Sequence, residues 1–178
     1  VQISVRGLGA RSAFGLRGFR LITDGIPATT PDGQGQASSV SLTSAERIEV
    51  LTGPLAQLYG NSAGGVIQVF TREAEKVPSL ESQLVTGSDG LSRTDWQFSQ
   101  QSGQVSLVGD YSTFHIQGHR AHSEAMRQQL NTLLRFDVSS DTRVKLIANV
   151  FKMPFAKDPL GLTLAQLEAN PKQAGNHA

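Results

Sequence analysis

The chain contains no cysteine, which excludes disulfide bonds, thiolate metal sites and cysteine nucleophiles. Charged residues are also scarce: they make up 17% of the 178 residues, below the roughly 25% of a typical soluble domain. The formal net charge is only +1, so the composition does not indicate nucleic acid as a partner. No run of about 18 apolar residues occurs, which excludes a transmembrane helix but not short transmembrane strands of alternating polarity.

The first part of the chain, up to about residue 74, is rich in glycine and carries short apolar runs between the glycines. The runs at 19–22, 48–51 and 66–70 predict short buried strands bounded by turns. Two short helices are predicted at Ser44–Arg47 and Pro54–Tyr59, the first from a serine cap and the second from a proline in the first turn. Residues 1–74 are therefore expected to form a small α+β unit.

From about residue 79 the sequence changes to period-two alternation of apolar and polar residues. This alternation predicts five β-strands, most of them about nine to eleven residues long, which is the length that a tilted strand needs to cross a bilayer. The strands are expected at 80–86, 95–99, 105–113, 130–138 and 144–150.

The predicted connections alternate in length. Gln101–Gly103 and Ser139–Thr142 are tight turns, whereas a long polar stretch covers His115–Gln128 and another begins at Lys152. Transmembrane barrels alternate short periplasmic turns with longer extracellular loops, and this order fits if the first strand runs outward from the periplasm. A soluble antiparallel sheet also alternates and also has hairpins, so the pattern by itself leaves both architectures open.

Several motifs occur in order along the first 71 residues. Arg6-Gly7, Arg17-Gly18 and Asp24-Gly25-Ile26-Pro27 are followed by Glu46–Pro54 (ERIEVLTGP) and by the stretch from Leu58 to Thr71. Together they resemble the plug domain of TonB-dependent outer-membrane receptors. One departure is a threonine before the Gly-Pro pair of ERIEVLTGP, where the family usually has arginine.

Further stretches resemble the pyrroloquinoline quinone receptor branch of this family, which is related in sequence to siderophore receptors. They are 14–18, 31–36, 118–123, 158–163 and Asn170-Pro171. The resemblance implies a plug domain at 1–74 that lacks its N-terminal part, and then the first five or so strands of a transmembrane β-barrel at 75–178. The barrel would be incomplete within these residues. No leader-like segment opens the chain, so any targeting signal is expected upstream.

The resemblance also implies which residues lie between plug and barrel. Lumen walls of such barrels are polar, so charged plug residues are expected to hold the wall through charge-assisted hydrogen bonds. The candidates are Arg6, Arg17, Glu46, Arg47 and Glu49. The simpler alternative is that they are solvated surface charges or a local pair on a helix.

Ligand contact is expected on the apical loops of the plug and on an extracellular loop. Arginine pairs well with the carboxylates of an anionic ligand, and glutamine supplies amide donors. The plug-loop candidates are Arg11, Ser12, Asp32, Gln34 and Gln36. The extracellular-loop candidates are His119 and Arg120.

The spacing of three histidines is compatible with a metal site: His115, His119 and His122. No set of carboxylates completes such a site, so no metal or cofactor is predicted. Ser12 and Ser62 lack a paired histidine and acid, so no catalytic residue and no enzyme is predicted.

The function expected from the resemblance is import of a scarce ligand, pyrroloquinoline quinone or a ferric siderophore, across the outer membrane. The plug would lie in the barrel lumen, lipid would surround the strands, and a TonB-type periplasmic protein would supply energy. The alternative is a soluble β-rich binding or adhesion module without transport. The surroundings of four aromatic side chains distinguish the two alternatives: Trp96, Phe98, Tyr111 and Phe136. They would meet lipid in the first case and a packed core in the second.

Overall fold

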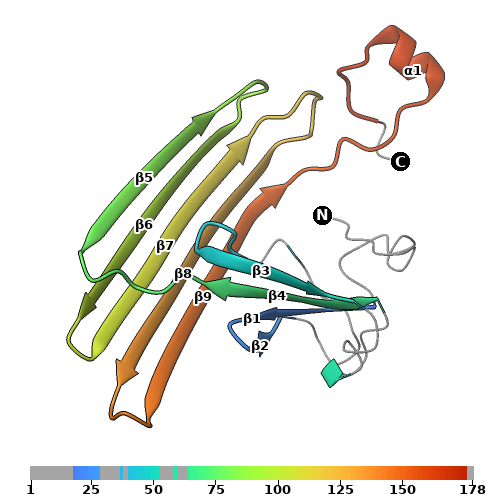
Figure 1. The fold of residues 1–178 in the computed structure, drawn as a ribbon. Coiled ribbons are helices and arrows are strands. Elements are labelled where there is room, and N and C mark those ends of the chain that lie inside the picture. The colour runs from blue at the N-terminus through green and yellow to red at the C-terminus, as the bar shows by residue number, and fades with distance from the viewer. Residues whose placement is uncertain (1–17, 29–36, 38–39, 53–57, 60–63, 176–178) are drawn as a thin grey trace. The chain divides into compact units, whose positions relative to one another are not determined.

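A computed structural model describes residues 18–28, 37, 40–52, 58–59 and 64–175 of the chain. The chain divides into two compact units, Val1–Glu73 and Ala74–Ala178. Each unit has its own β-sheet, and Figure 1 shows the four short strands of the first and the five long strands of the second. No described helix is long and apolar enough to span a membrane.

The sheet of the first unit has the order β2-β1-β4-β3. Its strands are β1 (Phe19–Thr23), β2 (Ile26–Pro27), β3 (Ala45–Leu51) and β4 (Gly65–Thr71). β1 runs parallel to β4, whereas β2 and β3 run antiparallel to their neighbours. The three strands predicted in this part of the chain are therefore confirmed.

Apolar side chains cover both faces of the central pair β1 and β4. Leu21, Ile67 and Val69 pack together in one cluster, and Ile22 and Val66 form a second cluster. A parallel pair that is buried on both faces needs apolar residues at consecutive positions rather than at alternate ones. This requirement explains the continuous apolar runs at 19–22 and 66–70.

A tight turn joins β1 to β2. Asp24 and Gly25 both have positive φ, +50° and +85°, as the two central residues of a type I′ turn require. The Asp24 carboxylate also accepts hydrogen bonds from the Thr71 amide at 2.8 Å and from the Thr71 hydroxyl at 2.6 Å. The turn is thereby fastened to the end of β4.

The helix predicted at Ser44–Arg47 is wrong, because this segment leads into β3. Ser44 is buried, and Ala45 begins a strand that pairs with β4 from Thr71 back to Val66. A single helical turn is marginal in water, whereas pairing with β4 satisfies the backbone of the whole segment. Of the second predicted helix, residues 53–57 lie outside the described residues, and Leu58 and Tyr59 lie in a 3₁₀ turn.

The second unit is a five-stranded antiparallel meander in which each strand pairs with the next along the chain. It consists of β5 (Ser79–Thr86), β6 (Ser92–Ser102), β7 (Val105–Ile116), β8 (Ala125–Asp137) and β9 (Arg143–Ala156), followed by the helix α1 (Leu164–Ala169). All five strands predicted from the alternation are confirmed.

The strands β7, β8 and β9 extend further than predicted. The polar stretch expected at His115–Gln128 shrinks to a connection at 117–124, and β9 continues four residues beyond Lys152. Ladder hydrogen bonds use backbone groups, so polar side chains such as Gln128 take part in a strand without weakening its pairing. Polarity alone therefore overestimated the length of these loops.

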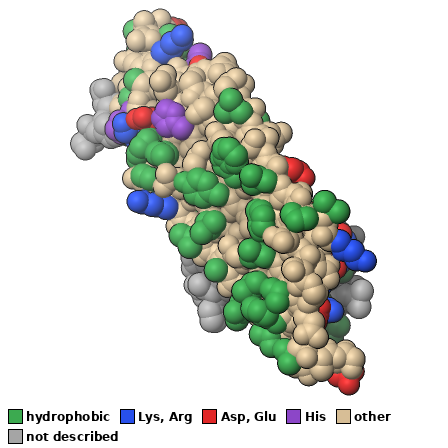
Figure 2. Space-filling view, turned by 90° about the vertical axis from the view of Figure 1, so that its left-hand side faces the viewer, with side chains coloured by type: hydrophobic (Ala, Val, Ile, Leu, Met, Phe, Trp, Pro, Cys, Tyr) green, Lys and Arg blue, Asp and Glu red, His purple; other side chains and the backbone are tan. Residues whose placement is uncertain are grey.

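The strand register sorts the side chains of the second unit onto two faces. Residues that pair across neighbouring strands form a row on one face. One such row contains Trp96, Tyr111, Leu130 and Val150, all exposed. The face to which they belong is called the apolar face below. Figure 2 shows hydrophobic side chains gathered on one face, with histidine side chains near one end.

The opposite face of the same sheet is polar. Asp95, Asp110 and Asn131 are buried there, and the Asn131 amide donates to both carboxylate oxygens of Asp110, at 3.1 and 3.2 Å. The Arg93 guanidinium pairs with Asp95 at 2.8 Å. An antiparallel sheet with exposed apolar side chains on one face and buried polar side chains on the other is the inverse of a soluble core.

We expect Asp24→Ala to weaken the first sheet by about 2–3 kcal/mol, because it removes two hydrogen bonds and places alanine at positive φ. Backbone hydrogen exchange of β4 in the detergent-solubilised full-length protein should then accelerate by about 30- to 150-fold. Asp24→Asn is the control, since asparagine tolerates this φ and keeps one acceptor oxygen. Equal exchange in both variants would contradict the role of the carboxylate.

Candidate functional site

A hollow of about 550 Å³ opens at the end of the second sheet where β7 and β8 are joined. Its wall comes from the connection 117–124, from the first residue after β9 and from the segment after α1. The charged and histidine side chains that line it are His119, Arg120, His122, Glu124, Lys157 and Lys172. Three permanent cations against one carboxylate make the hollow attractive to anions.

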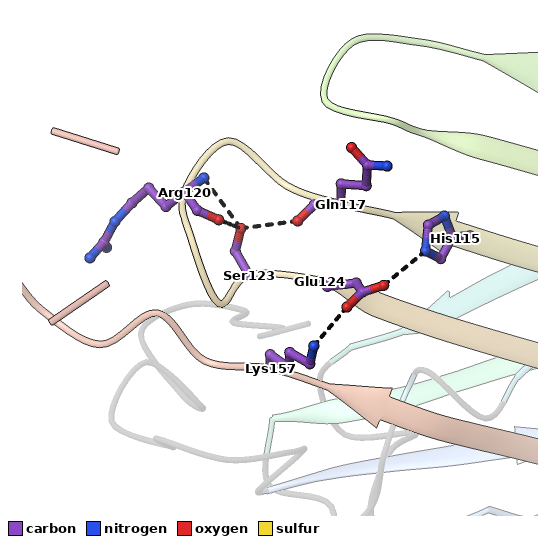
Figure 3. Close-up of polar contacts among 6 residues, drawn as sticks. All are labelled: His115, Gln117, Arg120, Ser123, Glu124 and Lys157. Carbon is purple, nitrogen blue, oxygen red and sulfur yellow. Dashed lines mark hydrogen bonds and ion pairs between the residues drawn. The ribbon is translucent and has the colours of Figure 1, made fainter. Parts of the chain in front are cut away.

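Glu124 joins three strands at the rim of this hollow (Figure 3). Its carboxylate lies 2.7 Å from the Lys157 ammonium and 3.3 Å from the His115 ring. The hydrogen bond from Lys157, and then that from His115, hold the pKa of Glu124 below its usual value of 4.5. The carboxylate therefore stays ionised at neutral pH and neutralises part of the local positive charge.

The connection 117–124 has a fixed local conformation. Gly118 has φ +83°, and a Cβ at this position would collide with the Ser123 hydroxyl, so only glycine fits. The Ser123 hydroxyl lies within hydrogen-bond distance of the carbonyls of Gln117 and Arg120, as Figure 3 shows. The amides of Gln117 and Gly118 both donate to the carbonyl of Asp89, which ties the connection to the β5–β6 turn.

Arg120 fastens the same connection to the C-terminal segment. Its guanidinium donates to the carbonyl of Pro159 at 3.0 Å and to the carbonyl of Gln173 at 3.1 Å. The amide of Ala121 donates to the carbonyl of Lys172 at 2.7 Å. Carbonyls are neutral, so Arg120 keeps its full positive charge while it holds the two segments together.

Of the predicted ligand residues, His119 and Arg120 lie together in this hollow. His119 is exposed, with its Nδ1 3.5 Å from the Asp89 carboxylate. The candidates of the plug loops lie outside the described residues: Arg11, Ser12, Asp32, Gln34 and Gln36.

Of the predicted plug–barrel contacts, Arg6 and Arg17 also lie outside the described residues. Glu46, Arg47 and Glu49 are on β3, where Arg47 pairs with Glu49 at 2.9 Å and lies 4.3 Å from the ring centre of Phe70. These contacts are local to the first unit, and an interface role for the three residues stays a prediction.

Sequence reasoning missed Glu124, Lys157 and Lys172. A β-bulge explains the case of Lys157: β9 has two residues, Met153 and Pro154, opposite the single Arg127 of β8. The extra residue moves Lys157 to the same face as Val150, whereas simple alternation places it on the other face. A proline in an alternating strand was the available signal, because proline within sheets is confined to edges and bulges.

The described histidines do not converge on a metal. His115 contacts Glu124 while His119 contacts Asp89, and the described ranges contain no group of three or more His, Asp or Glu side chains placed to hold an ion.

Comparison with known families decides the nature of the first unit. Residues 1–66 match the family described as "TonB-dependent Receptor Plug Domain". This match assigns a plug domain to these residues, which are 66 of the 178 in the chain. The chain thus has a plug domain followed by antiparallel strands, as predicted, and the sheet of these strands is not closed within the described residues.

Two curated relatives share sequence with part of the chain. The ferric enterobactin receptor of Pseudomonas aeruginosa is 33% identical over 85 residues, which cover 41% of this chain and 11% of the receptor. The iron-regulated outer membrane virulence protein of Vibrio cholerae is 38% identical over 88 residues, 48% of this chain and 14% of the relative. The chain thus spans only a small part of the length of these relatives.

Solved structures show that the fold of the plug and strands recurs. The siderophore receptor PirA from Pseudomonas aeruginosa matches with a TM-score of 0.63 and 22% identity over 85% of this chain and 28% of PirA. The pyoverdine outer membrane receptor FpvA of the same species matches with a TM-score of 0.64 and 22% identity over 78% of this chain and 21% of FpvA.

We expect acid to loosen the connection 117–124 where Glu124 leads into β8. The lowered pKa of Glu124 means that its ion pairs contribute fully above about pH 4.5 and are lost as the pH falls further, through the lowered pKa. A spin label on Ala121→Cys in the full-length protein should be more mobile near pH 3 than at pH 7, although the hydrogen bonds to neutral carbonyls remain.

Glu124→Gln should make this label mobile at both pH values and remove the pH dependence. Glu81→Gln, an exposed change on β5, is the matched control and should leave the mobility profile unaltered. An immobile label in Glu124→Gln at pH 7 would refute the role of the ion pairs.

Proposed function

We propose that this chain belongs to an outer-membrane receptor that imports a scarce anionic ligand, with a ferric siderophore as the first candidate. The plug domain is the observation that carries the proposal, because it occupies residues 1–66 and is followed by strands with an exposed apolar face. The names of two relatives, a ferric enterobactin receptor and an iron-regulated outer membrane protein, support iron as the cargo.

In this proposal residues 1–74 form the plug inside a barrel lumen, and residues 75–178 form the first strands of the barrel wall. The apolar face meets lipid, as Trp96 and Tyr111, both exposed, would require. Phe98 and Phe136 share that face and are half-buried by their neighbours. The connections at 87–91 and 117–124 then face the cell exterior, and the turns at 103–104 and 138–142 face the periplasm.

Ligand would be captured by the apical plug loops through Arg11, Ser12, Asp32, Gln34 and Gln36, and by His119 and Arg120 in the hollow. Binding alone shifts populations only by the difference in affinity between two states, so uphill import needs an energy source. We assign this role to a TonB-type periplasmic protein that acts on the plug. Arg6, Arg17, Glu46, Arg47 and Glu49 would hold the plug against the wall through polar contacts that can be remade when it moves.

Pyrroloquinoline quinone is the second candidate ligand. Two of the stretches that resemble receptors for this compound, 118–123 and 158–163, are joined in the structure by the hydrogen bond from Arg120 to the carbonyl of Pro159. This contact holds the second stretch against the connection that lines the hollow. Its positive charge suits a tricarboxylate as well as an anionic siderophore, so charge alone does not separate the two ligands.

Uptake by the full-length protein in cells with and without the energy-coupling system tests the proposal. We expect uptake of one ligand, from a panel of ferric siderophores and pyrroloquinoline quinone at limiting concentration, to require coupling. Arg11→Ala should reduce it by about 10- to 100-fold, as the loss of a charge-assisted hydrogen bond predicts. Lys76→Ala, in the exposed connection before β5, should transport normally. Uptake that is independent of coupling would refute active transport.

Membrane placement has its own test. Leu130→Arg puts a charge on the middle of the apolar face and should cost about 2–4 kcal/mol in urea unfolding of the protein in lipid vesicles. Asp141→Arg in the β8–β9 turn should cost less than about 0.5 kcal/mol. The described structure leaves Leu130 exposed and not in a packed core. A soluble module with Leu130 in water would therefore tolerate both changes equally, and that result would favour the alternative of a binding or adhesion module.

A further inference from the structure

The apolar face of the second unit ends in a collar of basic and aromatic side chains. Two residues beyond Val150, Lys152 pairs with Gln128. In the next row Met126 pairs with Phe155 of β9 and with His115 of β7. The row after that contains Lys157, whose amide donates to the carbonyl of Glu124.

The bulge at Met153 and Pro154 is what completes this collar. It compensates for the odd spacing between Lys152 and Phe155, so that both lie on the apolar face. The Lys157 ammonium lies 5.8 Å from the centre of the Phe155 ring, and the His115 ring meets Phe155 edge-on at 6.3 Å. The apolar rows therefore pass directly into an aromatic and cationic boundary.

The hollow described above continues from this boundary. Glu124 and Lys157 belong both to the last row of the apolar face and to the wall of the hollow, where Arg120 and Lys172 add two further cations. Lys157 gives one hydrogen bond to Glu124, and an ammonium has three donors, so it has capacity for an additional oxygen. An anion at this position would meet cations from both sides.

We propose that this end of the apolar face binds the phosphate headgroup of an anionic membrane lipid, with its acyl chains along the apolar face. The inference rests on the membrane placement in the proposed function and goes beyond ligand import. Lys152 and Lys157 flank the aromatic boundary, and Lys172 and Arg120 close over the phosphate from the hollow. Basic pockets at the ends of membrane-spanning segments bind lipid headgroups in this way.

A soluble phosphate ion has the same headgroup chemistry, but the structure favours the lipid. A soluble ion would use the hollow alone, whereas a lipid also uses the adjoining apolar rows and Lys152, which points from the apolar face. Burial of acyl chains on exposed apolar side chains adds binding energy that a free ion lacks. Binding of a lipid therefore requires Lys152 and an anionic lipid in the membrane, whereas binding of free phosphate requires neither.

The test uses the full-length protein in phosphatidylcholine nanodiscs that contain a few per cent of phosphatidic acid, with bound lipid counted by native mass spectrometry. The native protein should enrich phosphatidic acid. Lys157→Gln with Lys172→Gln should weaken this binding by about 30-fold, roughly fivefold for each lysine. A second pair, Lys152→Gln with Lys172→Gln, leaves the contact with Glu124 intact and should have a similar effect.

The control pair is Lys76→Gln with Lys145→Gln, which removes the same charge from a connection and from the polar face. It should bind phosphatidic acid as the native protein does. Equal enrichment by the collar variants and the control pair would overturn the lipid site. Lysine-dependent binding of inorganic phosphate in discs of pure phosphatidylcholine, without enrichment of phosphatidic acid, would overturn the lipid and identify a soluble anion.

Extraction of membranes with alkaline carbonate separates the two proposals. A protein that is released from the membrane overturns both the placement and the lipid site. A protein that stays integrated but shows no lysine-dependent lipid binding overturns the lipid site alone. Integration with lysine-dependent lipid binding but without coupled uptake leaves the lipid site standing and refutes transport.

Discussion

The hydrogen-bond ladder between β6, β7 and β8 is the constraint on which the second unit depends. It joins eleven residue pairs between β6 and β7 and twelve between β7 and β8 without a shift of register. A slip of one residue would move every side chain of a strand to the opposite face, so the unbroken ladder is what keeps Trp96, Tyr111 and Leu130 in one row on the same face. The exposed apolar surface, the buried polar network and the position of the hollow all follow from this register.

The ladder also explains why charged side chains lie together at its end. Glu124 lies just before the first residue of β8 and Lys157 just after the last residue of β9, yet the backbone pairing of these two positions continues that of the strands. Their side chains are therefore held side by side without a dedicated loop structure. Arg120 then uses neutral carbonyls to attach the neighbouring segment, which brings more positive charge to the same place without neutralising it.

Period-two alternation predicted all five strands of the second unit, because each has one apolar and one polar face. The apolar runs likewise predicted the strands of the plug. Prediction from the sequence failed where side-chain type and backbone pairing disagree. Gln128 and Gln129 lie in a strand despite their polarity. Ala45–Arg47 pairs with β4, although Ser44 resembles a helix cap. The site was predicted only through His119 and Arg120. Lys157 escaped because a single extra residue in β9 reverses the alternation, and Lys172 because its proximity depends on a tertiary hydrogen bond.

The parallel pairing of β1 with β4 has a consequence for the order in which the chain folds. Phe19 pairs with Gly65, and β3, which completes the sheet, pairs only with β4. The pairing of β1 with β4 needs the chain as far as residues 65–69, whereas each strand of the second unit meets its partner across a short connection. Long-range pairing is slow, and local hairpins form in microseconds. The plug is therefore not expected to fold first, although it precedes the second unit in the chain. Its strands pair while the hairpins of the second unit are already forming.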